Sequence, residues 1–294
     1  MEPPIIDKCA ACGKEGDSLK TCTACHMVKY CNRDCQISHQ SKHKKACKQR
    51  AAELYDEKLF KEVEPEECPI CFQPLPLDAR QTGFHPCCGK RICGGCVYAM
   101  LKSEGGSKQL CAYCRTPAAD DDEESIERIK KLMASENAYA YYHLAGGYMN
   151  INREWGLPQD YQRANEILLK AGELGCAQAY SNLAKSYLEG LGVEVNKKKA
   201  KHYYELSAMM GSVAGRFNCG FIEFEAGNED RAVKHMIMAA KAGYVDALGF
   251  CKAGYRDGAI TKDEYASTLR AYHERQTEMK SEMRDKAAAY NFAT

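Results

Sequence analysis

Cysteine spacing constrains this chain more than any other feature of its sequence. Fifteen of the eighteen cysteines lie between residues 9 and 114, mostly in C-x2-C pairs. Two intervening residues let both sulfurs of one tight turn reach a single tetrahedral zinc ion. The stretch Met1–Asp7 has no basic flank or long apolar core, so we expect no secretory leader and a reducing compartment. The pairs therefore predict zinc sites rather than disulfides.

The first cluster supplies eight candidate zinc ligands between residues 9 and 47. They are Cys9, Cys12, Cys22, Cys25, Cys31, Cys35, His43 and Cys47. Eight ligands suffice for two zinc ions, but the spacing alone does not distinguish sequential from interleaved pairing. A segment this short buries too little core to fold without metal.

This spacing resembles that of the MYND zinc finger at all eight positions. The resemblance implies one zinc ion on Cys9, Cys12, Cys31 and Cys35, and another on Cys22, Cys25, His43 and Cys47. His26 and His39 are then solvated bystanders. MYND fingers commonly carry an aromatic residue where Gln40 follows His39, so capture of proline-containing peptides in the family's mode is in question here.

The second cluster lies between residues 68 and 114 and contains only cysteines. It comprises Cys68, Cys71, Cys87, Cys88, Cys93, Cys96, Cys111 and Cys114. It resembles an all-cysteine RING-type finger, whose cross-brace implies a zinc ion on Cys68, Cys71, Cys93 and Cys96. The other ion takes Cys111, Cys114 and two ligands from residues 85–90.

The identity of one ligand in that stretch is open. Lys90 stands at the position of the usual RING histidine, and a protonated lysine is a poor zinc ligand. The ligand must therefore be Cys87 or His85. We favour Cys87 together with Cys88, since Gly89 allows the unusual backbone that adjacent ligands need.

Three residues match the surface with which RING fingers hold a ubiquitin-conjugating enzyme. They are Ile70, Arg115 and Pro117. RING ligases act by positioning a loaded conjugating enzyme, so they need no covalent catalytic residue. One residue argues against this role: Ala112 stands after Cys111, where RING fingers commonly carry a proline. Ile70 can also simply pack the zinc loop, and Arg115 can be a solvated cation.

The chain after the second finger predicts a solenoid of helical repeats. Residues 140–145 align with residues 179–184, and the units end at Gly175, Gly211 and Gly243. The fragments Lys185–Val193 and Lys199–Tyr204 resemble Sel1-like repeats, which implies stacked helix pairs and a scaffolding role. Cys219 and Cys251 fall in register with Leu183, so we expect them, and Cys176, to be packing residues.

The segments that flank these modules have their own signals. The amphipathic stretch 51–67 predicts a linker helix. The acidic run 120–124 should stay extended as a boundary, with Ser125 capping the next helix. Thr261–Glu264 forms a capping box that begins a long helix through about Tyr290. The charged second half of that helix is expected to project into solvent.

Together these patterns predict two small zinc-stabilised α+β fingers followed by an all-α solenoid of helix-turn-helix repeats. The expected regions are a MYND-type finger (1–50), a helical linker (51–67), a RING-like finger (68–118), an acidic linker and helix (119–136), Sel1-like repeats (137–276) and a helical tail (277–294). No apolar run is long enough to span a membrane. Four zinc ions are expected per chain.

Each module presents surface rather than a reaction cleft. The leading interpretation is a cytoplasmic or nuclear zinc-dependent adaptor whose partners are other proteins. The alternative is a RING-type ubiquitin ligase whose solenoid recruits substrate. No finger places base-reading residues on a helix in the C-x-x-C…H-x-x-x-H mode, so a nucleic-acid partner is not expected. Four zinc ions on fifteen thiolates also change the formal charge from +1 to about −6.

Overall fold

The computed structural model describes residues 8–16, 18–103, 110–149 and 156–291. Contacts within the chain divide it into two compact units, Met1–Lys61 and Glu62–Thr294. Residues 1–7, on which the leader expectation rests, lie outside the described part of the chain. So do residues 150–155.

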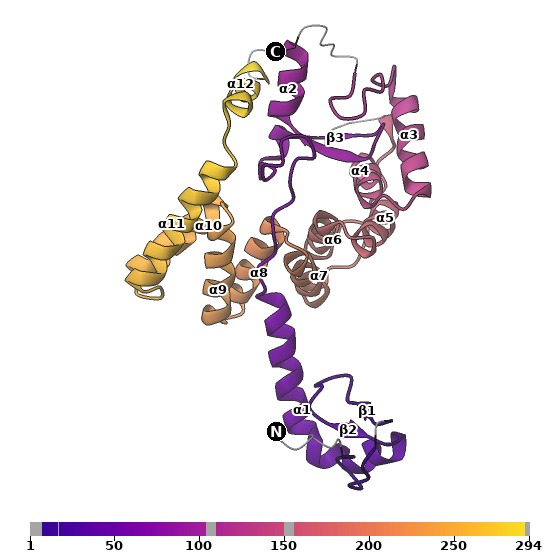
Figure 1. Ribbon diagram of the computed structural model, residues 1–294, viewed down its shortest axis with the longest axis vertical. Helices are drawn as coiled ribbons and strands as arrows, with labels where there is room; N and C mark the ends of the chain where they lie inside the picture. The colour runs from indigo at the N-terminus through magenta and orange to yellow at the C-terminus, as the bar shows by residue number, and fades with distance from the viewer. Residues whose placement is uncertain (1–7, 17, 104–109, 150–155, 292–294) are drawn as a thin grey trace, which may run out of the picture. The chain divides into compact units, whose positions relative to one another are not determined.

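The first unit consists of two very short strands and one long helix (Figure 1). β1 (Lys20–Thr21) pairs antiparallel with β2 (Lys29–Tyr30), and α1 (Arg33–Leu59) follows. The side chain of Asn32 accepts a hydrogen bond from the backbone N–H of Cys35 and so caps α1.

The helical linker expected over 51–67 is not a helix of its own. α1 continues without a break from the first finger to Leu59. No glycine or proline occurs between Arg33 and Leu59, so nothing in the local sequence ends the helix earlier. The helical part of the expected linker is therefore the second half of α1, and residues 61–66 are not helical.

The second unit begins with the second finger, which is built around one hairpin and one helix. η1 (Ala79–Gln81) leads into β3 (Thr82–His85), which pairs antiparallel with β4 (Lys90–Cys93). α2 (Gly94–Lys102) starts directly after β4, with Cys93 at its N-cap. Two cysteine-containing turns, one before η1 and one after α2, complete the finger.

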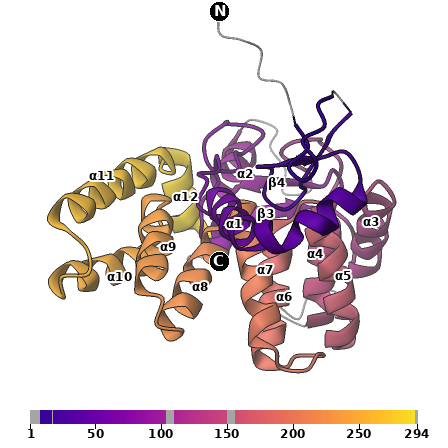
Figure 2. The same cartoon turned by 90° about the horizontal axis from the view of Figure 1, so that it is seen from below.

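Nine helices follow the second finger in the described part of the second unit, and α12 (Glu282–Asn291) comes after them. They are α3 (Asp122–Ala134), α4 (Ala138–Met149), α5 (Tyr161–Glu173), α6 (Ala177–Glu189), α7 (Lys197–Met209), α8 (Val213–Glu225), α9 (Glu229–Lys241), α10 (Val245–Arg256) and α11 (Lys262–Glu278). Each packs against the next in chain order, as the two views show (Figures 1 and 2). This is the expected solenoid.

Glycines end the repeats as the sequence predicts. Gly175, Gly211 and Gly243 have φ values of 109°, 92° and 97°. An L-residue with a side chain rarely adopts this backbone, so glycine fits each of these helix ends without strain. Turns of the same kind after α5, α7 and α9 repeat the geometry that lets the helix pairs stack.

The solenoid core is filled largely by alanines and other small residues. Cys219 and Cys251 are 2% and 0% exposed, and Leu183, in register with them, is 3% exposed. Cys176 is also fully buried. The three cysteines outside the fingers are therefore packing residues, as expected.

The acidic run does not stay extended. α3 begins at Asp122, and the side chain of Asp121 accepts a hydrogen bond from the backbone N–H of Glu124. Asp121 rather than Ser125 is thus the N-cap. Carboxylates in the first turn interact favourably with the positive end of the helix dipole, which outweighs their mutual repulsion.

The C-terminal region also differs from expectation. Thr261 and Glu264 form the predicted capping box. However, α11 stops at Glu278, and a separate helix, α12 (Glu282–Asn291), follows. α12 packs against α2 of the second finger instead of projecting into solvent (Figure 1).

Candidate metal centres

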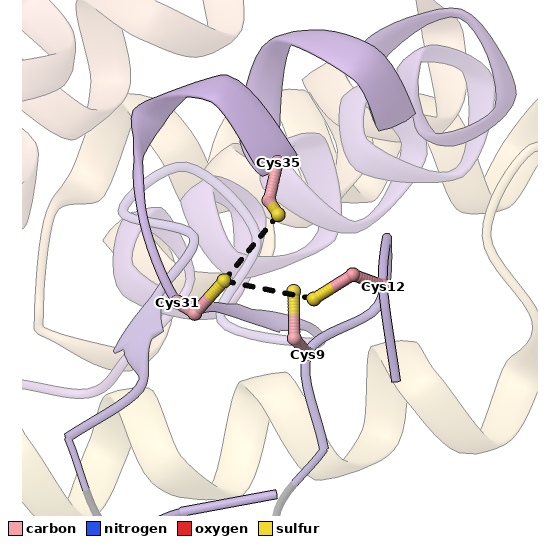
Figure 3. A group of neighbouring side chains, drawn as sticks. All are labelled: Cys9, Cys12, Cys31 and Cys35. Carbon is pink, nitrogen blue, oxygen red and sulfur yellow. Dashed lines mark hydrogen bonds between the residues drawn. The ribbon is translucent and has the colours of Figure 1, made fainter. Parts of the chain in front are cut away.

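Site 1 belongs to the first finger and consists of Cys9, Cys12, Cys31 and Cys35 (Figure 3). Cys9 and Cys12 come from the turn before β1, Cys31 follows β2, and Cys35 lies in the first turn of α1. The Sγ atoms of Cys12 and Cys31 are 3.7 Å apart, and those of Cys31 and Cys35 are 3.3 Å apart.

Site 2 combines the turn between β1 and β2 with the middle of α1. Its members are Cys22, Cys25, His43 and Cys47. The Sγ of Cys25 lies 3.2 Å from Nε2 of His43. His39 lies one turn earlier, where its Nδ1 is 3.1 Å from the hydroxyl of Tyr30, and it stays outside the four-ligand set.

Site 3 belongs to the second finger and consists of Cys68, Cys71, Cys93 and Cys96. The Sγ atoms of Cys68 and Cys96 are 3.8 Å apart, as are those of Cys71 and Cys93. Cys68 and Cys93 are 0% and 1% exposed. Site 3 thus has two almost fully buried sulfurs.

Site 4 consists of Cys87, Cys88, Cys111 and Cys114. The Sγ of Cys114 lies 3.4 Å from that of Cys87, and the Sγ atoms of Cys88 and Cys111 are 3.9 Å apart. His85 is not in this cluster. Of the two ligand sets left open by the sequence, the structure brings together the one with adjacent cysteines.

The four clusters have the dimensions of tetrahedral zinc sites. A Zn–S bond of about 2.3 Å in a tetrahedron places two sulfurs about 3.8 Å apart. Neighbouring sulfurs in these clusters lie 3.3 to 3.9 Å apart, and all ligand atoms of one cluster lie within 4.8 Å of one another. A disulfide needs about 2.05 Å, and all eighteen cysteines are free. Each cluster can therefore bind one zinc ion through four protein ligands.

Four of the turns that carry these cysteines share one backbone conformation. The residue after the second cysteine has a left-handed φ at Gly13 (74°), His26 (58°), Phe72 (57°) and Arg115 (62°). In each turn its N–H donates to the carbonyl of the first cysteine, as from Gly13 to Cys9. Three non-glycine residues hold a sparsely populated conformation, which persists only where the surroundings impose it.

The same turns direct backbone N–H groups at the first sulfur, which favours the thiolate that zinc requires. The N–H of Cys12 is the main reason why the pKa of Cys9 falls to about 6. For Cys68, burial raises the pKa, but the N–H groups of Cys71 and Cys93 outweigh it and bring the pKa to about 7. The donor set and its surroundings both fit a zinc ion.

His85 lies outside the site 4 cluster, and its neighbours in the hairpin contact the first repeat. It ends β3, and burial lowers its pKa. Next to it, Phe84 stacks on His143 of α4 with ring centroids 4.2 Å apart. The carbonyl of Gly89 accepts a hydrogen bond of 3.4 Å from Asn137. The β3–β4 hairpin is thus fixed against the first repeat.

The three residues suggested for a conjugating enzyme are all on the surface. Ile70 is 37% exposed between two ligands of site 3. Arg115 and Pro117 are exposed after the last cysteine of site 4, and the carbonyl of Pro117 accepts a hydrogen bond of 2.7 Å from Arg128. Exposure is compatible with a partner surface and with ordinary zinc loops.

The remaining cysteines are not nucleophiles. Burial raises the pKa of Cys176 and of Cys251 to about 12. Burial likewise raises the pKa of Cys219. A thiol reacts as its thiolate, so these side chains are inert at neutral pH.

Sequence reasoning missed Arg284, which lies beside site 3. Its guanidinium comes from α12, more than two hundred residues along the chain from Cys71. Nothing in the local sequence marks this arginine among the other charged residues of the C-terminal region. Only the packing of α12 on the finger reveals it.

Within the described residues, no helix combines the length and apolar character needed to cross a lipid bilayer.

Comparisons with known proteins agree with two of the modules. Residues 9–47 match the family model of the MYND finger. Residues 138–176, 177–212 and 223–244 match that of the Sel1 repeat. The chain therefore carries a MYND finger and Sel1 repeats, as the resemblances implied. For residues 68–118, the RING resemblance still rests on the cysteine pattern alone.

Individual relatives resemble only parts of the chain. A Sel1-like repeat-containing protein of Acanthamoeba polyphaga mimivirus is 31% identical over 64 residues, which is 22% of this chain and 12% of that protein. A Sel1 repeat protein from Oxalobacter formigenes is 22% identical with a TM-score of 0.46, covering 54% of this chain and 67% of its own. A protective antigen of uropathogenic Escherichia coli with an SLR fold is 27% identical with a TM-score of 0.46. The match covers 55% of this chain and 35% of that antigen.

Proposed function

We propose that this chain, with its MYND finger and Sel1 repeats, is a zinc-dependent adaptor that binds other proteins in the cytoplasm or nucleus. The observation that carries this proposal is the closed coordination of the four sites. Each offers four protein ligands, as structural zinc sites do, whereas a catalytic site keeps one position open for water or substrate. Zinc then stabilises surfaces and performs no chemistry.

The proposal assigns sixteen ligands to four zinc ions. Site 1 and site 2 belong to the MYND finger (1–50), and site 3 and site 4 to the RING-like finger (68–118). The repeats (137–276) add stacked helix pairs, the architecture with which solenoids present extended binding surfaces. Partners are recognised by the first finger and by the repeats.

Affinity purification with quantitative mass spectrometry tests the adaptor role. The full chain is compared with Cys31→Ser, which removes a ligand of site 1, and with Lys286→Met as a surface control. We expect a subset of retained proteins to disappear with Cys31→Ser and to persist with the control. If the same proteins are retained by all three chains, the first finger is not a binding module.

A RING-type ubiquitin ligase is the second candidate function. It is supported by the exposure of Ile70 in the site 3 loop and of Arg115 beside site 4. The purified, zinc-loaded chain is incubated with ubiquitin, activating enzyme and a panel of conjugating enzymes. Chain formation that is lost on Ile70→Ala would overturn the pure adaptor, whereas inactivity with the whole panel would remove the ligase candidate.

A further inference from the structure

The last helix of the chain inserts an arginine beside site 3. Arg284 of α12 is only 4% exposed. Its Nη1 donates to the carbonyl of Pro74 at 2.8 Å, and its Nη2 lies 3.4 Å from the carbonyl of Gln73. The same Nη2 is 3.6 Å from the Sγ of Cys71. The guanidinium thus binds both the loop and the sulfur of one ligand.

The surface of α2 allows α12 to pack closely against it. Gly95 lies in the first turn of α2, and a Cβ there would lie 2.8 Å from the backbone nitrogen of Arg284. Further along the two helices, the rings of Tyr98 and Tyr290 meet at 5.7 Å. Lys102 lies over the ring of Tyr290 at 4.9 Å. The position of Arg284 is therefore set by close packing of α12 on α2, not by its own flexible side chain.

The charge of the zinc site explains why a buried arginine is stable there. Four thiolates on one divalent ion leave two net negative charges, and Cys68 and Cys93 are almost fully buried. A buried charge is costly unless an opposite charge and hydrogen bonds compensate it. The planar guanidinium donates to three carbonyls, those of Pro74, Gln73 and Met279, and faces the sulfur at the same time, which a lysine ammonium does less well.

We propose that Arg284 is a positioning residue of site 3, which holds the Cys71 loop and stabilises the zinc-bound thiolates from the outer coordination shell. This inference rests on the proposed zinc binding. Outer-shell partners orient ligands and retain the metal, and their loss commonly costs about 10- to 100-fold in metal affinity. Arg284 also makes α12 a component of the second finger.

The arrangement links the finger to both ends of the repeats. At the other end of the array, Glu66 accepts a hydrogen bond of 2.6 Å from the hydroxyl of Tyr139 on α4 and pairs with Arg91 of β4. Arg91 also lies over the ring of Tyr139. The second finger therefore contacts α4, where the repeats begin, and α12, which follows them. Loss of zinc from site 3 should release α12, because Arg284 binds the Cys71 loop.

Site-resolved alkylation of the zinc-loaded full chain tests the proposal. The chain is exposed to N-ethylmaleimide with a zinc chelator, and mass spectrometry follows Cys71 and Cys93 of site 3 against Cys111 and Cys114 of site 4. We expect Arg284→Met to accelerate the labelling of site 3 about tenfold or more, with site 4 little changed. If Arg284→Met destabilises the finger in general, labelling will accelerate equally at site 3 and site 4. That result would overturn the positioning role.

Three further variants keep the test decisive. Arg284→Lys should restore part of the slow labelling, because it retains the charge. Gly95→Ala keeps Arg284 but displaces α12, and should accelerate site 3 as Arg284→Met does. Lys286→Met removes an exposed cation from the same helix and should label like wild type. If Arg284→Met fails to fold, Arg284→Lys and Gly95→Ala still test the role of Arg284. Labelling of site 3 at the wild-type rate in both variants would overturn the inference.

Zinc content separates this inference from the proposed function. Four zinc ions in the untreated wild-type chain, with unchanged labelling in the Arg284 and Gly95 variants, would leave the zinc sites standing and reject the role of Arg284. Two or fewer zinc ions in folded wild-type chain would reject the zinc assignment itself, and the inference with it.

Discussion

Glu223 gives the most direct test of what holds the repeats together. Its side chain is 1% exposed on α8. Its oxygens accept hydrogen bonds from Nζ of Lys201 at 2.9 Å, Nε of Arg231 at 2.9 Å and Nδ2 of Asn228 at 2.7 Å. Burial raises the pKa of Glu223, but these partners outweigh burial and lower the pKa to about 2.

The expected cost of Glu223→Gln follows from this pKa. A fall from 4.5 to about 2 corresponds to about 3.4 kcal/mol of preference for the charged form in the folded state. The side chains of Lys201 and Arg231 are 34% and 29% exposed, so water screens part of the interaction. We expect the free energy of unfolding to fall by about 2 kcal/mol, and the midpoint of thermal unfolding by about 4–8 °C.

The lowered pKa also fixes the pH dependence. A group whose pKa is lower in the folded state contributes stability that is fully present above its unfolded value, here 4.5. That stability is lost as the pH falls through the folded value of about 2. The difference between wild type and Glu223→Gln should therefore stay constant between about pH 8 and pH 5.5.

Urea unfolding followed by circular dichroism, with zinc present, measures the difference. Glu225→Gln is the matched control, because Glu225 lies exposed on the same helix. A loss for Glu223→Gln no larger than that of the control would refute the reasoning. So would a difference that changes between about pH 8 and pH 5.5, since Glu223 would then titrate in that range.

Three other expectations follow from local geometry. Elemental analysis should find four zinc ions in the wild type and in His85→Ala but only three in Cys87→Ser, and an equal loss in both variants would contradict the ligand set of site 4. Thr261→Ala should lower the free energy of unfolding by about 1 kcal/mol through loss of the capping box, whereas an unchanged urea midpoint would show that α11 does not need its cap. Gly192→Ala should lower the thermal midpoint, because φ is 68° there and a Cβ would lie 2.5 Å from Tyr161, and an unchanged midpoint would show that the turn can relax.

Much of the candidate site could be predicted from the chain alone. Zinc ligands must come from turns of fixed length, so the spacing of Cys9, Cys12 and the later pairs marked the ligands in advance. The choice between Cys87 and His85 was harder, because both lie within three residues of Cys88 and either can ligate zinc. Only the path of the β3–β4 hairpin, which leaves His85 outside the cluster of four sulfurs, separates them.

The incorrect predictions of helix boundaries have a common physical cause. Charge and propensity are weak signals for where a helix begins and ends. The acidic residues after Asp121 were expected to repel one another, yet at a helix N-terminus the dipole compensates them. The first half of the last helix is highly charged, and its packing on α2 depends on a glycine, Gly95, almost two hundred residues earlier.

The sequence by itself determined the ligand clusters, the repeat period and the glycines that end the repeats, because each depends on residues close together in the chain. The tertiary structure alone decided which residues surround each cluster. A charged side chain such as Arg284 normally stays in solvent, because its burial is costly without an opposite charge and hydrogen bonds. Its place depends on the summed packing of α12, α2 and the Cys71 loop, segments that meet only when the repeats have folded.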